Sequence, residues 1–245
     1  MTIDEFLTNV RRIQAADPRY RLGRDGSDGY CDCIGLVIGA AWCVCGALPL
    51  PGLARAAGFA LVPVWVTGGI HLDGYADTCD ALSSYGDREK KLEILKDPHC
   101  GAFAVIRLCS YFLAYFALCT CVQFTPRVGA LWTLALVLER TLSGYAVAAF
   151  PMAKNTGLAH TFATAADKTT VRRVLTVLAV VLAAGMMFLH GWALVLAALA
   201  VLFYYNKMSA KQFGGITGDL AGWFLQKAEL WMLAALCACQ WGGLL

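Results

Sequence analysis

Seven of the chain's seventeen acidic residues lie between Gly68 and Gly101, and they are Asp73, Asp77, Asp80, Asp87, Glu89, Glu93 and Asp97. If the segment from Leu72 to Ser83 is helical, Asp73, Asp77 and Asp80 follow an i, i+4, i+7 spacing and project from one face. Carboxylates stacked in this way repel one another. A divalent cation is their natural partner, so Asp73, Asp77 and Asp80 are predicted metal ligands.

Two neighbours of these acids are also candidates. Gly74 has no side chain, so a ligand or another helix can approach closely there. His71 precedes Asp73 by two residues and would face away from the carboxylates within a helix, so it is a ligand only if the helix begins after it. The alternative is a purely structural role in which the acids cap a helix end, but a cap needs one acid rather than three.

The segment from Arg88 to Asp97 predicts a short amphipathic helix that ends before Pro98. Glu93 and Asp97 are four residues apart and could complete the metal shell, while Arg88 and Lys96 could hold a phosphate. The alternative is a surface helix held by salt bridges, which this segment taken alone would favour.

A third polar motif, Phe213 to Asp219, leads into the last apolar segment. Its glycines, Gly214 and Gly215 among them, stand with Thr217 and Asp219 at a predicted helix N-terminus, where backbone N–H groups can meet an anion. Glu229 follows on the same stripe as Asp219. A charge in an apolar segment is costly, so Lys227 and Glu229 are expected to face the protein interior or a wet cavity.

Arginine also occurs within apolar segments. Arg107 and Arg140 could neutralise a phosphate, or they could pair with Glu139 or Glu229. The residues alone leave both interpretations open.

The composition is that of a membrane protein. Of 245 residues, 59% are hydrophobic and 15% are charged, whereas soluble domains have about 45–50% apolar and about 25% charged residues. We expect one domain over residues 1–245 that is embedded in the lipid bilayer. No basic stripe interleaved with aromatics indicates nucleic-acid binding. Eight of the eleven cysteines form C-x-C pairs whose side chains point apart on a helix, so they are interpreted as small hydrophobic residues.

Seven apolar segments are expected to span the membrane, at about 33–50, 54–70, 101–122, 128–150, 173–189, 191–206 and 220–244. The predicted fold is therefore an all-α polytopic bundle of about seven transmembrane helices. Lys and Arg gather in the segments before the first span and after the second, fourth and sixth. This distribution places the N-terminus and the acidic segment, residues 68–101, in the cytoplasm. Residues 1–29 are expected to form a cytoplasmic segment with an amphipathic helix.

Taken together, these motifs resemble the cobalamin synthase family, the adenosylcobinamide-GDP ribazoletransferases. The resemblance is strongest in the run from His71 to Asp80, His-Leu-Asp-Gly-Tyr-Ala-Asp-Thr-Cys-Asp. It continues at Arg88-Glu89, Leu92-Glu93-Ile94, Lys96-Asp97, Gly101, Arg140, Gly157-Leu158, Gly214-Gly215, Thr217-Gly218-Asp219 and Glu229. It covers most of the chain from Ile34 onward.

This resemblance implies a Mg²⁺-dependent enzyme of the bacterial inner membrane with its active site facing the cytoplasm. It would join adenosylcobinamide-GDP to α-ribazole, or to α-ribazole 5′-phosphate, and release GMP. Asp73, Asp77, Asp80 and Asp97 would hold the metal, and Asp80 or Glu93 would accept the hydroxyl proton. The residues that would bind the substrate or its phosphates are Arg88, Lys96, Arg140, Gly214, Gly215, Thr217, Asp219 and Glu229. Whether the chain forms a homo-oligomer stays open.

Two other functions compete with this one. A CDP-alcohol phosphotransferase runs the same type of reaction with a related acidic motif, but Asp77 stands where that motif has arginine. A cation-coupled transporter would also contain intramembrane Arg and Glu. It should, however, show charges near the bilayer midplane on both faces and often repeated halves, and we find no internal repeat.

Overall fold

The computed structural model describes residues 28–153 and 168–245, and every regular element within these ranges is an α-helix. The described helices are α2 (Asp28–Ala47), α3 (Gly52–Thr67), α4 (Ile70–Ser83), α5 (Arg88–Ile94), α6 (Ala102–Cys121), α7 (Pro126–Ala149), α9 (Lys168–Phe188), α10 (Trp192–Gln212) and α11 (Gly218–Trp241). The predicted amphipathic helix near the N-terminus and the Gly157-Leu158 motif lie outside the described residues.

Each of the seven predicted apolar segments is helical. Among the described helices, α6, α9 and α10 are long and apolar enough to cross a membrane, and the bent pair α3 and α4 could form a fourth crossing. Valines on the outer side of α9, such as Val177 and Val180, are exposed, as expected of a surface that faces lipid. The chain therefore has the character of an all-helical membrane protein, while the number of seven crossings stays a prediction.

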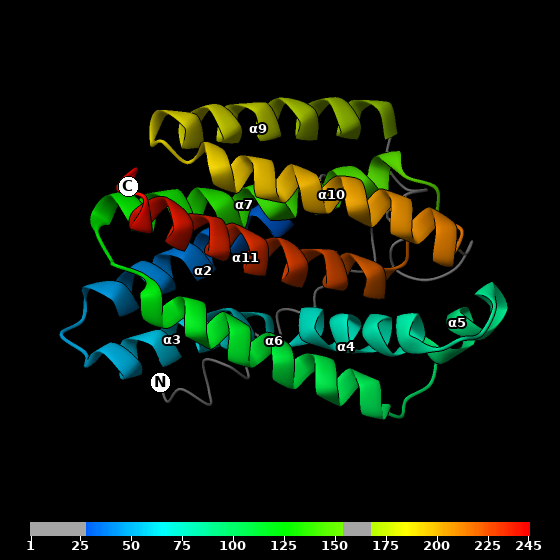
Figure 1. Ribbon diagram of the computed structural model, residues 1–245. Helices are drawn as coiled ribbons and strands as arrows, with labels where there is room; N and C mark the ends of the chain where they lie inside the picture. Colours follow the sequence, from blue (N-terminus) through cyan, green and yellow to red (C-terminus); the bar gives the residue numbers. More distant parts are fainter. Residues whose placement is uncertain (1–27, 154–167) are drawn as a thin grey trace, which may run out of the picture.

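The helices run mostly antiparallel along one bundle axis (Figure 1). The α2–α3, α6–α7 and α9–α10 connections lie at one end, together with the C-terminus. The other end carries α5, the last turns of α4 and α10, and the first turn of α11. We call this second end the acidic end, because it contains the acids of α4 and α5 and the motif from Phe213 to Asp219. The two motifs are far apart in the sequence but lie side by side in the fold.

The core next to α2 is aromatic. Trp42 of α2 stacks on Phe59 of α3 with ring centroids 3.8 Å apart, and Trp132 of α7 lies 6.0 Å away. All three side chains are fully buried. Gly35 allows α2 to pack directly on the α7 backbone, because a Cβ there would lie 2.9 Å from the Leu136 carbonyl oxygen. This packing makes α2, α3 and α7 a rigid support for the bundle.

A two-glycine break turns the chain from α3 into α4. Gly68 and Gly69 have φ angles of 66° and 80°, in the left-handed region that other residues avoid. The axes of α3 and α4 therefore meet at 94°. The break allows α4 to lie along α11, which places the acidic motif against the last helix.

The contact between α4 and α11 depends on two further glycines. A Cβ at Gly74 would lie 2.8 Å from the carbonyl oxygen of Asp219, and one at Gly222 would lie 2.9 Å from that of His71. Both neighbours are backbone atoms, which cannot move without shifting a helix. The close approach predicted at Gly74 is thus an approach of another helix.

Gly74→Ala is expected to destabilise the protein by about 1–3 kcal/mol, because the added methyl group forces α4 and α11 apart. Thermal unfolding of the purified protein in detergent would measure the loss. Gly218→Ala is the matched control, since a Cβ at Gly218 meets nothing within 4 Å. Equal unfolding temperatures for the two variants would contradict the close packing described here.

Candidate active site

The acidic face of α4 is the centre of the candidate site. The helix runs from Ile70 to Ser83, so Asp73, Asp77 and Asp80 share one face as predicted. Asp77 lies between the other two, and both of them repel its charge. Asp219, from the first turn of α11, adds a third repulsion. The fold therefore gathers four carboxylates, one of them contributed from far along the chain.

The side chain of Asp80 lies in space that is open only because residue 101 is glycine. The Asp80 carboxylate lies against the Cα of Gly101, where any Cβ would overlap both of its oxygens. Gly101 is the residue before α6 begins. The Asp80 carboxylate therefore lies close to the N-terminal, positive end of the α6 dipole. Gly101 is one of the residues that carry the family resemblance, and the sequence alone gave no physical reason for a glycine at this position.

Helix α5 is attached to the glycine turn between α10 and α11. The Arg88 guanidinium rests on Gly214, whose missing side chain leaves room for it. The ammonium of Lys91 donates to the side-chain oxygen of Gln212 at the end of α10. Asp87 caps α5 by accepting the backbone N–H of Lys90 at 3.0 Å. The predicted phosphate ligands Arg88 and Gly214 are thus brought together.

The glycine turn offers fewer backbone donors than its sequence predicted. The N–H of Gly215 donates to Ser209 at 3.1 Å, and that of Ile216 donates to Pro151 at 2.8 Å. These two N–H groups are engaged within the protein and are not available to an anion. Gly214 has a φ of 74°, and a Cβ at Gly215 would overlap the backbone at Met152, so both positions need glycine. These glycines shape the turn and admit Arg88.

Thr217 starts α11 and places Asp219. The Thr217 hydroxyl accepts the backbone N–H of Leu220 at 3.3 Å and caps the helix. Asp219 then lies in the first turn, where the helix dipole favours a negative charge. Thr217 therefore caps the helix that positions Asp219, while its predicted contact with a substrate phosphate stays a prediction.

Three predicted site residues on the segment after α4 are exposed. Glu93 forms a surface ion pair with Lys90 at 3.0 Å. Asp97 accepts the backbone N–H of His99 at 2.9 Å and contacts its ring. These hydrogen bonds lower the pKa of Asp97 below its usual value. Lys96 is exposed at the end of the same segment. For Glu93, the structure therefore agrees with the alternative prediction of a surface helix held by salt bridges.

His71 does not face the carboxylates. Helix α4 begins at Ile70, so His71 lies inside the helix, and the condition under which it would be a metal ligand is not met. Its backbone contacts Gly222, and Arg140 lies close enough to influence its ring. His71 therefore belongs to the packing contact between α4 and α11.

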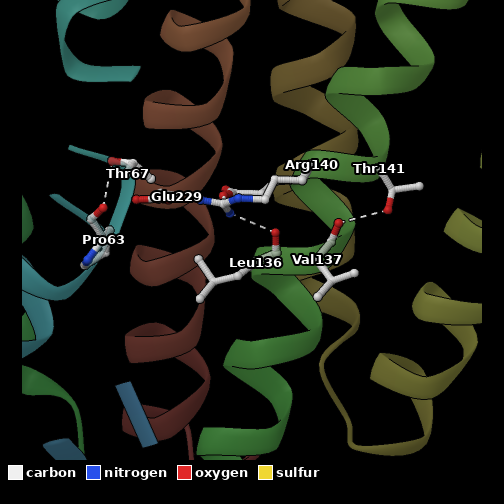
Figure 2. A network of polar contacts seen from close by, with 8 residues as sticks. Pro63, Thr67, Leu136, Val137, Arg140, Thr141 and Glu229 are labelled. Atoms are coloured by element: carbon white, nitrogen blue, oxygen red, sulfur yellow. Dashed lines mark hydrogen bonds and ion pairs between the residues drawn. The ribbon is translucent and has the colours of Figure 1, made fainter. Parts of the chain in front are cut away.

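Arg140 and Glu229 form a buried ion network (Figure 2). The Arg140 guanidinium contacts Glu139 and reaches Glu229 Oε1 at 3.5 Å, and it also donates to the Leu136 carbonyl at 2.9 Å. Arg140 is only 4% exposed and Glu229 only 1%. The structure thus favours pairing over phosphate binding for Arg140. Glu229 lies ten residues beyond Asp219, about 15 Å along the helix, so it belongs to this network and not to the acidic face.

The donor set at the acidic face suits a hard divalent cation. Four carboxylates supply the oxygen ligands that Mg²⁺ prefers, and their mutual repulsion favours a cation among them. Within residues 28–153 and 168–245, however, no three Asp, Glu, His or Cys side chains are already arranged to hold an ion. The chemistry of the site therefore fits Mg²⁺, and the carboxylates would have to draw together around it.

Comparison with known proteins decides the family. A family model described as cobalamin-5-phosphate synthase matches residues 5–237. The chain belongs to the cobalamin-5-phosphate synthase family. No solved structure matches the chain.

Curated relatives of this cobalamin-5-phosphate synthase family member include a protein of Lachnoclostridium phytofermentans that is 43% identical over 186 residues, 75% of this chain and 70% of the relative. A Clostridium botulinum protein is 28% identical over 229 residues, 90% of this chain and 91% of the relative. A Pseudomonas savastanoi protein is 35% identical over 182 residues, 72% of this chain and 73% of the relative. All three are named adenosylcobinamide-GDP ribazoletransferase.

Proposed function

We propose that this protein is an adenosylcobinamide-GDP ribazoletransferase, which joins adenosylcobinamide-GDP to α-ribazole or its 5′-phosphate and releases GMP. The observation that carries the proposal is the meeting of Asp73, Asp77 and Asp80 with Asp219 at the acidic end. Such a cluster suits a reaction whose substrate is a diphosphate and whose leaving group is a phosphate. The name of the relatives, adenosylcobinamide-GDP ribazoletransferase, supports adenosylcobinamide-GDP as this diphosphate.

The transfer needs one bond to form and one to break. The ribose hydroxyl oxygen attacks the phosphorus nearer the cobinamide, and the bond from that phosphorus to the bridging oxygen breaks. GMP leaves with the bridging oxygen, and the hydroxyl proton passes to a carboxylate that keeps one oxygen free of the metal. Asp80 suits this role better than Glu93, because Asp80 lies at the four-carboxylate cluster while Glu93 is paired with Lys90 on the surface.

Asp73, Asp77, Asp80 and Asp219 would hold Mg²⁺ at this site, and Asp97 is a further predicted ligand. Bound Mg²⁺ would neutralise the diphosphate and stabilise the charge on the departing phosphate. Arg88, held on Gly214, supplies a positive charge at the same acidic end of the bundle.

The acidic end is proposed to face the cytoplasm of a bacterial inner membrane. The Lys and Arg residues of the connecting segments support this orientation, because fifteen of the twenty lie on the side that also carries the acidic motif. Water-soluble substrates of the size of adenosylcobinamide-GDP would reach the site from that side.

The assay that tests the proposal combines purified protein, Mg²⁺, adenosylcobinamide-GDP and α-ribazole. Cobalamin and GMP should appear in equal amounts. A parallel reaction with a CDP-alcohol and an alcohol acceptor should give no CMP. Release of CMP without GMP, with an active relative as positive control, would assign the protein to the CDP-alcohol phosphotransferases instead.

Arg88→Gln is expected to raise the KM for adenosylcobinamide-GDP by about tenfold, because a charged hydrogen bond to a phosphate contributes about 1.5–3 kcal/mol. Lys90→Gln, on the same helix but paired with Glu93, is the matched control and should leave KM within about twofold. Initial rates at varied substrate concentration measure both. An unchanged KM for Arg88→Gln would remove Arg88 from the phosphate site.

A further inference from the structure

A large cavity lies outside the acidic face. It has a volume of about 680 Å³ and is bounded by α4, α6, α10 and α11. Helix α10 packs on one side of α11, and α4 and α6 pack on the other (Figure 1). We call this cavity the basic groove, because Arg107 of α6 and Lys227 of α11 are its two charged lining residues. None of the four clustered carboxylates lines it.

The two cations of the basic groove have no anionic partner within the described residues. Neither Arg107 nor Lys227 makes an ion pair there, and each repels the charge of the other. The Lys227 ammonium lies 5.5 Å from the Tyr75 ring and 6.0 Å from the Trp223 ring. Contacts with aromatic faces compensate only part of the cost of a cation away from water. Two unpaired cations that share one cavity make it a site for an anion.

The rest of the basic groove is suited to hydrocarbon. Leu82, Val201 and Trp231 are among the apolar residues of its wall. Trp231 is itself 57% exposed, so the groove reaches the outer flank of the bundle. Ile106, next to Arg107 in α6, is 57% exposed, and Phe203, next to Tyr204 in α10, is 66% exposed. In a membrane protein such a flank contacts acyl chains. A small inorganic anion would satisfy the cations but leave the apolar wall empty.

We propose that the basic groove binds one anionic phospholipid, with its phosphate at Arg107 and Lys227 and an acyl chain along the apolar wall. Basic pockets between membrane helices bind acidic lipid head groups in this way. The lipid would also contact Cys79, Leu82 and Ser83 of α4. It would therefore support the helix that carries the acidic face through residues other than the four clustered aspartates. This inference does not depend on the identity of the substrate.

The test is native mass spectrometry of the whole protein, transferred from detergent that contains phosphatidylglycerol or phosphatidylcholine. The wild type should retain one phosphatidylglycerol and at least tenfold less phosphatidylcholine. The double variant Arg107→Gln, Lys227→Gln should lose at least tenfold in phosphatidylglycerol affinity. The control Arg55→Gln, Arg127→Gln removes two positive charges at the start of α3 and of α7, at the opposite end of the bundle from the acidic end and outside the groove lining, and should bind as the wild type does.

A second variant keeps the test decisive if the double variant fails to fold. Ala200→Trp fills the groove from its exposed side and leaves both cations in place. It should lose phosphatidylglycerol and also the rise in unfolding temperature that the lipid gives the wild type. Equal retention of phosphatidylglycerol by wild type and Ala200→Trp would overturn the proposal. So would displacement of the lipid by inorganic phosphate alone, because the groove would then be a simple anion site.

Discussion

Asp77→Asn is expected to lower the rate of GMP release by at least about 100-fold, because it removes the central one of four carboxylates that would hold the metal. Asp77 is the acid whose charge Asp73, Asp80 and Asp219 all repel. The amide keeps the size of the side chain but cannot replace the charge. Removing one of four like charges should leave the thermal stability of the protein unchanged or slightly increased.

Glu89→Gln is the control for this prediction, since Glu89 is an exposed acid on α5. It removes one negative charge from the same end of the bundle and should keep full activity. Steady-state assays of both variants, at saturating substrate and varied Mg²⁺, give the comparison. Normal turnover by Asp77→Asn would show that the acidic face of α4 is not the metal site.

Arg140→Met is expected to destabilise the protein by about 3–5 kcal/mol, the largest effect on stability predicted here. The substitution leaves Glu139 and Glu229 buried next to each other without the guanidinium that both now contact. Thermal unfolding in detergent would measure the loss. Arg127→Met, on the same helix, removes an exposed arginine that donates to Leu189 and should cost less than about 1 kcal/mol.

The triple variant Glu139→Gln, Arg140→Met, Glu229→Gln shows whether the instability comes from two buried glutamates left without a cation or from the loss of Arg140 itself. It removes all three charges together, so most of the stability lost in Arg140→Met should return. If the single and triple variants unfold at the same temperature, repulsion between the two glutamates is not the cause of the instability.

Much of this arrangement was predictable from local sequence. The i, i+4, i+7 spacing placed three aspartates on one face of α4, and the structure confirms it. The seven apolar runs located the helices α2, α3, α6, α7, α9, α10 and α11. Asp219 was expected at a helix N-terminus by resemblance and by its place after three glycines, and it is found there, next to Asp77.

Other features depend on contacts that no local pattern encodes. Whether Arg140 pairs or binds phosphate was open because the partner Glu229 lies 89 residues away, and only the packing of α7 on α11 brings the two together. The N–H groups of the glycine turn seemed available, but Pro151 from the end of α7 accepts one of them. The basic groove needs residues from four helices, so Arg107 and Lys227 gave no signal of a shared cavity in the sequence.

Binding of Mn²⁺, used in place of Mg²⁺, tests the central claim most directly. Electron paramagnetic resonance of the purified protein with adenosylcobinamide-GDP would count the bound ions in wild type, Asp77→Asn and Glu89→Gln. The account predicts bound Mn²⁺ in wild type and Glu89→Gln, and at least tenfold weaker binding in Asp77→Asn. Equal Mn²⁺ binding by all three proteins would contradict a metal site on the acidic face of α4.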